Sequence, residues 1–426
     1  MKLAIVKNSC LSAAGRGVHL IVPFVIAAFF GSTPETDVFF LTYGLILFLT
    51  LVIGYIFENV IVPIVAEVLH ARGDVGKLVG GILFRGTLFL LFFLPALLLI
   101  FKPLIRLTTN LPEPSLELGF RLSLLMAPTI LLVTWTSALS GALNAAKFFS
   151  VPALSPAVRS AVVIGAIVLW GKRLGVEGIA VGYTVGELLR FGVAFGEFQK
   201  RLGPLHFGWE TVPGITSFFE SIAPQALGFS FFYLVPVVNQ MTTSWIGAGE
   251  ISLYTYAERI RNVPFLIFST GVLPVILSYW ANEQRSNPET FSWRKSRRLI
   301  WAVTGITALI FLAAWFCRDF IVTFALGRGA FPQAKLGVTG SLFSLLLACF
   351  PFEAMALLCI RLLIIFKKDW AYVVWAFAKL IGIGILNVFM VPAMGILGVG
   401  FSVAVVNSIF GLLLYAYVSH LYGRER

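Results

Sequence analysis

Thirteen charged residues lie inside apolar stretches of the sequence, where a charge is costly unless it faces a cavity or a partner. Eight are basic and five acidic: Arg16, Glu58, Arg85, Arg159, Glu187, Arg190, Glu220, Glu258, Arg259, Arg261, Glu353, Arg361 and Lys379. A cavity lined by an excess of basic groups favours an anionic ligand such as a phosphate or a pyrophosphate. Arginine suits this chemistry because its planar guanidinium can donate two hydrogen bonds to phosphate oxygens.

Several of these charges have a simpler explanation than a ligand site. Arg85, Arg190 and Arg361 can extend their long side chains to a nearby membrane surface. Glu187 and Arg190 are three residues apart, a spacing that lets them pair on one face of a helix. Residue type alone therefore does not decide which charges face a cavity.

The elements that carry these charges are predicted to be membrane-spanning helices. Of the 426 residues, 58% are hydrophobic and 12% are charged, and the mean hydropathy is +0.92. Soluble domains carry about 25% charged residues, and a spanning helix needs about 20 apolar residues. We therefore predict an all-α polytopic membrane protein of about twelve helices. Their ranges are 9–30, 38–65, 79–101, 121–145, 151–170, 175–197, 216–246, 251–280, 298–317, 338–365, 369–391 and 395–420.

Basic residues between the predicted helices set the orientation. With both termini in the cytoplasm, the inner segments hold about twice as many Lys and Arg residues as the outer segments, as the positive-inside rule requires. The run WRKSRR at 293–298 is the strongest single signal, and we interpret it as a loop beside anionic lipids. The net charge of +12 is thereby explained without a nucleic-acid partner.

Residue clusters typical of catalysis or metal binding do not occur in the sequence. The four cysteines form no CxxC pair and no cluster with histidine. There is no Walker A motif for nucleotide hydrolysis and no grouping of carboxylates with histidine. We therefore expect no enzyme, no cofactor and no metal.

An internal repeat predicts two halves. GVEGIAVGYTVG at 175–186 matches GILGVGFSVAVV at 395–406, an offset of 220 residues. We predict a six-helix half at 1–198, a connecting loop at 199–215 and a second six-helix half at 216–426. Transporters built from such repeats bind substrate between the halves near mid-membrane.

Four segments resemble the MviN/MurJ family of lipid-linked oligosaccharide flippases. They are FFGSTPETDVFFLTYGL (29–45), ENVIVPIVAE (58–67), YTYAERIRNVPFLIFSTGVLPVILS (254–278) and LGRGAF (326–331). Their order and spacing follow that family over most of the chain. The wider relatives are polysaccharide exporters and multidrug and toxin extrusion (MATE) transporters, which share a twelve-helix core.

The resemblance implies a transporter with alternating access in the bacterial cytoplasmic membrane. It would carry a polyprenyl-pyrophosphate-linked saccharide across the bilayer, with H⁺ or Na⁺ as a possible coupling ion, surrounded by membrane lipids and acting as a monomer. By the same resemblance Arg16, Asp37 and Arg259 match family positions for substrate contact. Eight residues are predicted to contact substrate: Arg16, Asp37, Glu58, Asn59, Arg85, Glu258, Arg259 and Arg361.

The sequence departs from the family pattern at several positions. An Arg-Asp pair of the first helix is replaced by Val22 and Pro23, and a double Arg of the second helix by Thr50 and Leu51. The chain ends at Arg426, so we expect the twelve-helix core without the two further C-terminal helices of the peptidoglycan flippases. The central cavity is therefore expected to carry fewer cations than the resemblance implies.

These departures leave alternatives open. The cargo is either a peptidoglycan precursor or another lipid-linked saccharide. A cation-coupled drug exporter of the MATE type would instead use an acidic residue of the cleft, such as Glu58, Glu220 or Glu258. An inactive relative and an integral-membrane transferase are further alternatives, and the latter lacks a catalytic cluster in the sequence.

Overall fold

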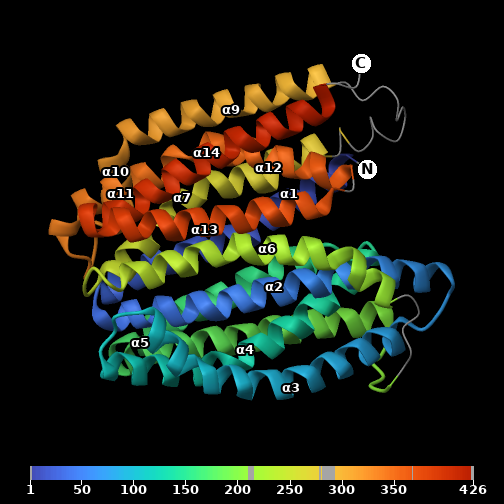
Figure 1. Cartoon of the computed structure of the whole chain (residues 1–426). Coiled ribbons are helices and arrows are strands. Elements are labelled where there is room, and N and C mark those ends of the chain that lie inside the picture. The colour runs from blue at the N-terminus through green and yellow to red at the C-terminus, as the bar shows by residue number, and fades with distance from the viewer. Residues whose placement is uncertain (1, 210–214, 278–279, 281–292, 367, 424–426) are drawn as a thin grey trace. The chain divides into compact units, whose positions relative to one another are not determined.

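The computed structural model describes residues 2–209, 215–277, 280, 293–366 and 368–423, and within them every regular element is helical. The chain divides into two compact units, Met1–Ala226 and Leu227–Arg426. The boundary between the units falls inside a helix, α6. Figure 1 shows the long helices of each unit side by side. The elements are α1 (Lys2–Phe30), α2 (Pro34–His70), α3 (Val75–Thr108), α4 (Glu113–Ala145), α5 (Ser150–Leu202), α6 (Ile215–Thr243), α7 (Glu250–Ile267), η1 (Phe268–Val272), α9 (Trp293–Phe316), α10 (Arg318–Leu326), η3 (Gln333–Lys335), α11 (Leu336–Ala348), α12 (Phe350–Ile365), α13 (Asp369–Met394) and α14 (Ile396–Gly423).

The predicted all-α membrane architecture is confirmed. Nine stretches of the described residues are long and apolar enough to cross a membrane. One of them, Ser150–Leu202, contains two helices that meet at Gly175. When these two helices are counted separately and α1 and α6, each of 29 residues, are added, the described part of the chain has twelve stretches of membrane-spanning length.

The conspicuous motif near the N-terminus is a tight helix-to-helix turn. Gly31 has a φ of 67°, which suits a residue without a side chain, and its N–H bonds to the carbonyl of Ala27 at the end of α1. Thr33 then caps α2 through reciprocal hydrogen bonds with Thr36, and Pro34 occupies the first helical turn. The motif thus fixes the start of α2 by local chemistry.

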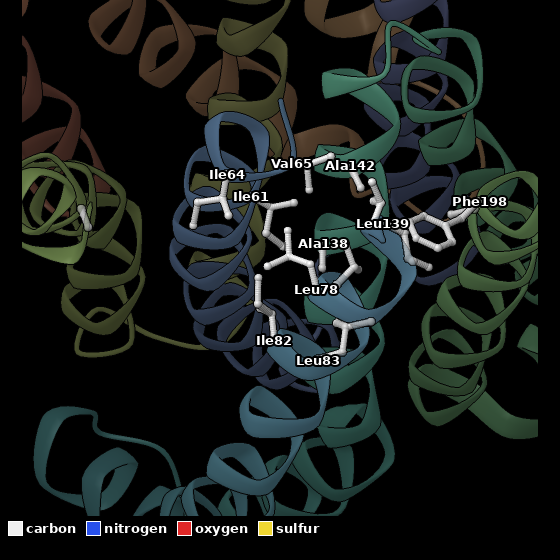
Figure 2. Packing of buried hydrophobic residues seen from close by; sticks show 14 residues of the cluster. Ile61, Ile64, Val65, Leu78, Ile82, Leu83, Ala138, Leu139, Ala142 and Phe198 are labelled. Carbon is white, nitrogen blue, oxygen red and sulfur yellow. The ribbon is translucent and has the colours of Figure 1, made fainter. Parts of the chain in front are cut away.

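The core of the first unit lies where α2, α3 and α4 meet. Figure 2 shows aliphatic side chains from these helices in contact, with Phe198 of α5 at one side. Ile61, Val65 and Leu139 are fully or almost fully buried there. This packing supplies the rigid frame on which α5 is placed.

The repeated motif has the same backbone conformation in both units. Gly175 has φ 58° and ψ −143°, and Gly395 has φ 59° and ψ −139°. A residue with a side chain is strained in this region, which explains glycine at both positions. A Cβ on Gly186 would lie 2.9 Å from the carbonyl oxygen of Arg159. This short distance shows that, within α5, the helix after Gly175 packs closely against the helix before it.

Two expected helices are interrupted. The helix predicted at 338–365 ends at Ala348 and restarts at Phe350, with Pro351 in the first turn of α12. The helix that begins at Glu250 passes into a π-helical segment, Phe268–Val272, soon after Pro264. Both breaks follow from prolines, which remove a backbone donor from the helix.

Candidate functional site

The first unit holds a closed cluster of three charges within α5. Arg190 Nη1 lies 2.7 Å from Glu187 Oε1, and Arg159 Nη1 lies 3.3 Å from Glu187 Oε2. Glu187 is fully buried, and Arg190 also donates to the hydroxyl of Ser155. The pairing predicted from the three-residue spacing is confirmed. Because both carboxylate oxygens are engaged, the cluster joins the two helices of α5.

The second unit holds a comparable centre built from three different helices. Arg261 of α7 forms an ion pair with Oε2 of Glu353 of α12. Lys379 of α13 lies 3.9 Å from Oε1 of the same carboxylate, which is beyond hydrogen-bond distance. Glu353 stands in the first turn of α12, where the helix dipole favours a negative charge. The helix break at Pro351 therefore creates the position that a carboxylate occupies.

A pocket lies beside this centre. Glu353, Lys379 and Asn407 contribute charged and amide groups to its wall, and the other lining residues are four aromatic residues and six aliphatic or glycine residues. The Lys379 ammonium is 4.4 Å from the centroid of the Phe232 ring, a cation–π contact. The pocket wall combines one cation, one carboxylate, one amide and several aromatic rings, which suits binding of a charged group attached to an apolar body.

A polar network explains why the YTYA motif has its particular residues. Asn239 donates to the hydroxyl of Tyr254, and Asn387 donates to the side-chain oxygen of Asn239, each at 2.9 Å. Gln240 donates to the hydroxyl of Thr255 at 3.0 Å. These bonds connect α6, α7 and α13 inside the second unit, so both motif residues hold helices together.

The predicted contact residues of the first unit lie in different surroundings. Asp37 is buried in the first turn of α2. Glu58 is exposed, and Asn144 donates to its Oε1 at 3.3 Å. Arg85 is half-buried with its guanidinium 6.0 Å from the centroid of the Trp209 ring. The side chains of Arg16 and Asn59 lie outside the described residues.

The predicted contact residues of the second unit lie on α7 and α12. Glu258 is buried, whereas Arg259 beside it is half-buried. Arg361 is exposed on α12. Among the described side chains of these two helices, no hydrogen bond or ion pair joins Glu258, Arg259 and Arg361 to one another.

The sequence does not predict that Arg261, Glu353 and Lys379 lie together. Arg261, Glu353 and Lys379 were each recognisable as charges in apolar stretches, but Arg261 and Glu353 are 92 residues apart. The sequence offers one signal for Lys379, because the offset of 220 residues aligns it with Arg159. It offers none for the pairing of Arg261 with Glu353.

The chain resembles known proteins along most of its length. The family model for the lipid II flippase MurJ matches residues 26–421. A probable lipid II flippase MurJ of Buchnera aphidicola is 24% identical over 328 residues, which cover 72% of this chain and 63% of that protein. The lipid II flippase MurJ of Burkholderia cenocepacia is 25% identical over 209 residues, covering 47% of this chain and 39% of that protein. The chain thus spans less than two thirds of the length of these two relatives.

Solved structures share the fold. A lipid II flippase MurJ in an inward closed conformation superposes with a TM-score of 0.83 at 20% identity, covering 97% of this chain and 87% of that one. An inward-facing MATE family multidrug transporter superposes with a TM-score of 0.82 at 11% identity, covering 99% and 98%. The fold is therefore common to both kinds of transporter, whereas the sequence match distinguishes them. On the match over residues 26–421, this chain belongs to the lipid II flippase MurJ family.

Proposed function

We propose that the protein is a flippase that moves a polyprenyl-pyrophosphate-linked saccharide, such as a peptidoglycan precursor, across the membrane by alternating access. The observation that carries this proposal is the family match, which runs through both units from residue 26 to residue 421. The relatives named above are flippases of lipid II, a lipid-linked precursor. Moving a bound headgroup requires no chemical conversion, so the proposal includes no catalytic residue.

Among the predicted residues, we assign the main contact with the headgroup to Arg259. Arg259 is half-buried and forms no ion pair or hydrogen bond with the described residues. A guanidinium in this state can donate to the oxygens of a pyrophosphate. Arg16, Asp37, Glu58, Asn59, Arg85, Glu258 and Arg361 complete the proposed contact set.

The cellular setting follows from the same proposal. The protein would lie in the bacterial inner membrane as a monomer, with both termini in the cytoplasm, as the loop charges indicate. A gradient of H⁺ or Na⁺, or the membrane potential, would supply the driving force. Cysteine labelling at positions 2 and 424 in intact cells tests the orientation, since cytoplasmic sites react only after permeabilisation.

Two assays test the flippase proposal directly. The gene should restore growth to bacteria depleted of their own lipid II flippase, and liposomes containing the purified protein should move fluorescent lipid II between leaflets. Success in both supports peptidoglycan precursor transport. Liposomes that move a different lipid-linked saccharide but not lipid II would change the cargo, and liposomes that move neither would contradict the proposal.

A MATE-type drug exporter is the second candidate because the fold matches such a transporter with a TM-score of 0.82. Its test is cation-dependent drug efflux in inverted vesicles. In that case Glu58→Gln should remove the cation dependence. Vesicles without efflux would count against this candidate.

A further inference from the structure

We propose that the pocket beside Lys379 in the second unit binds the phosphate group of an anionic membrane lipid. This site lies within one unit and goes beyond the transport proposed above, since it does not depend on which saccharide is carried. The argument rests on the distance of the Lys379 ammonium from its carboxylate partner, on a comparison with the first unit and on the composition of the pocket wall.

Like the cluster of the first unit, where Arg159 and Arg190 share Glu187, the charged centre of the second unit has two cations for one carboxylate. Arg261 and Lys379 share the single carboxylate of Glu353, and Arg261 takes its Oε2. Lys379 is left 3.9 Å from Oε1 and in contact with the Phe232 ring. The Lys379 side chain is only 13% exposed. A buried ammonium has three donors to satisfy, so an anionic oxygen beside it would supply both a partner and charge balance.

The first unit shows what occupies the corresponding place. The offset of 220 residues aligns the cations Arg159 and Lys379 on the first helix of each repeated pair. It also aligns Glu187, which accepts from Arg159, with Asn407. The second unit therefore keeps the cation of the pair and replaces the carboxylate with a neutral amide. Asn407 and Lys379 both line the pocket, so the replaced carboxylate corresponds to accessible space.

Two further polar residues of the first-unit cluster also align with apolar residues in the second unit. Ser155 and Arg190, which complete the closed cluster of the first unit, align with Trp375 and Phe410. Both aromatic residues line the pocket. A hydroxyl and a guanidinium that filled the site are thus replaced by rings that can pack against hydrocarbon.

The composition of the pocket wall favours the phosphate of a lipid over free phosphate. Free phosphate would meet one ammonium, one amide and the carboxylate of Glu353, with apolar groups around most of the rest of the site. A lipid phosphate brings acyl or glycerol carbons that can cover Phe232, Trp375 and Phe410. We therefore assign the pocket to an anionic phospholipid, and free phosphate is the competing source that the experiment excludes.

The test measures lipid binding by the full chain in detergent. Phosphatidylglycerol, phosphatidylcholine and inorganic phosphate are added separately, and the apparent melting temperature and the bound lipid seen by native mass spectrometry are recorded. Phosphatidylglycerol should raise the melting temperature of the unaltered protein and bind at one saturable site, whereas the other two should not. Stabilisation by inorganic phosphate, or equal stabilisation by phosphatidylcholine, would overturn the assignment.

Variants place the site. Lys379→Gln should weaken phosphatidylglycerol binding by about tenfold to a hundredfold, the effect of losing a hydrogen bond to a charged group, and Lys379→Arg should retain it. Lys368→Gln is the matched control, because Lys368 is an exposed lysine at the start of the same helix. Undiminished binding by Lys379→Gln would overturn the proposal.

Asn407→Glu keeps the test valid if Lys379→Gln fails to fold. This change restores at the aligned position the carboxylate that Glu187 supplies in the first unit. The variant should be stable without lipid and should no longer respond to phosphatidylglycerol. A folded Asn407→Glu variant that still binds the lipid as tightly as the unaltered protein would contradict the site. Transport assays are not part of this readout, so its failure is distinguishable from failure of the flippase proposal.

Discussion

Arg159 and Lys379 are aligned by the repeat, yet only Arg159 has a carboxylate partner on the helix that follows it. Its Nη1 lies 3.3 Å from Glu187, whereas Lys379 faces Asn407 across a pocket and lies 3.9 Å from Glu353 of an earlier helix. One unit has thus kept a closed ionic contact where the other has an open polar site. Substitutions in the two charged centres are therefore expected to have different effects.

Replacing Glu187 should destabilise the first unit strongly. Glu187→Gln leaves Arg159 and Arg190 without their shared carboxylate in a buried site. Breaking a buried pair in this way costs about 3–5 kcal/mol, measured as a fall in the free energy of SDS-induced unfolding in mixed micelles. Glu197→Gln is the control, because the Glu197–Arg201 pair is partly exposed and its loss should cost about 0.5 kcal/mol at most. Equal effects would show that burial of Glu187 does not matter.

Replacing Glu353 should be harmful for a different reason. Glu353→Gln leaves two cations, Arg261 and Lys379, with no carboxylate between them. Adding Lys379→Met removes one of these cations, so the double variant should recover part of the lost stability. A double-mutant cycle on the same unfolding assay measures this coupling. Strictly additive effects would show that the two side chains do not interact.

Substitution of glycine should separate close helix packing from helix propensity. A Cβ at Gly186 would lie 2.9 Å from the carbonyl oxygen of Arg159, so Gly186→Ala should destabilise α5 by about 1–3 kcal/mol. Gly192 has open space around it on the same helix, so Gly192→Ala should stabilise it by about 0.5–1 kcal/mol. The unfolding assay gives the two signs, and the same sign for both would refute this account of the packing.

Arg259 provides the sharpest test of the proposed headgroup contact. Arg259→Ala should abolish growth rescue in the flippase-depleted strain while the protein still reaches the membrane, and Arg259→Lys should retain part of the activity because it keeps the charge. Arg173→Ala serves as the control, since Arg173 is an exposed arginine in α5. Full rescue by Arg259→Ala would remove this residue from the contact set.

The features that could be predicted from sequence are those set by local spacing. The helices follow from apolar runs, and the Glu187–Arg190 pair follows from three residues on one helical face. The conformation at Gly175 and Gly395 is a local backbone property, and the repeat identified both glycines. Each of these depends on residues close together in the chain.

The centre at Glu353 could not be predicted in the same way. Its partners come from α7 and α13, so tertiary packing decides which charges meet. The break at Pro351 was visible as a proline, but spanning helices tolerate proline without breaking. Position along the chain therefore did not reveal that Glu353 begins a helix.

The single-residue connection at Gly175 also bears on how the chain enters the membrane. Arg159 is synthesised 28 residues before Glu187, so the first helix of α5 is made before its buried cation has a partner. We expect the two helices of α5 to leave the insertion machinery together as a hairpin. Lys379 is made after Glu353, so α13 can enter beside an acid already in place. In both units a cation is thus made before its carboxylate, but in the second unit the interval spans several helices, because Arg261 precedes Glu353 by 92 residues.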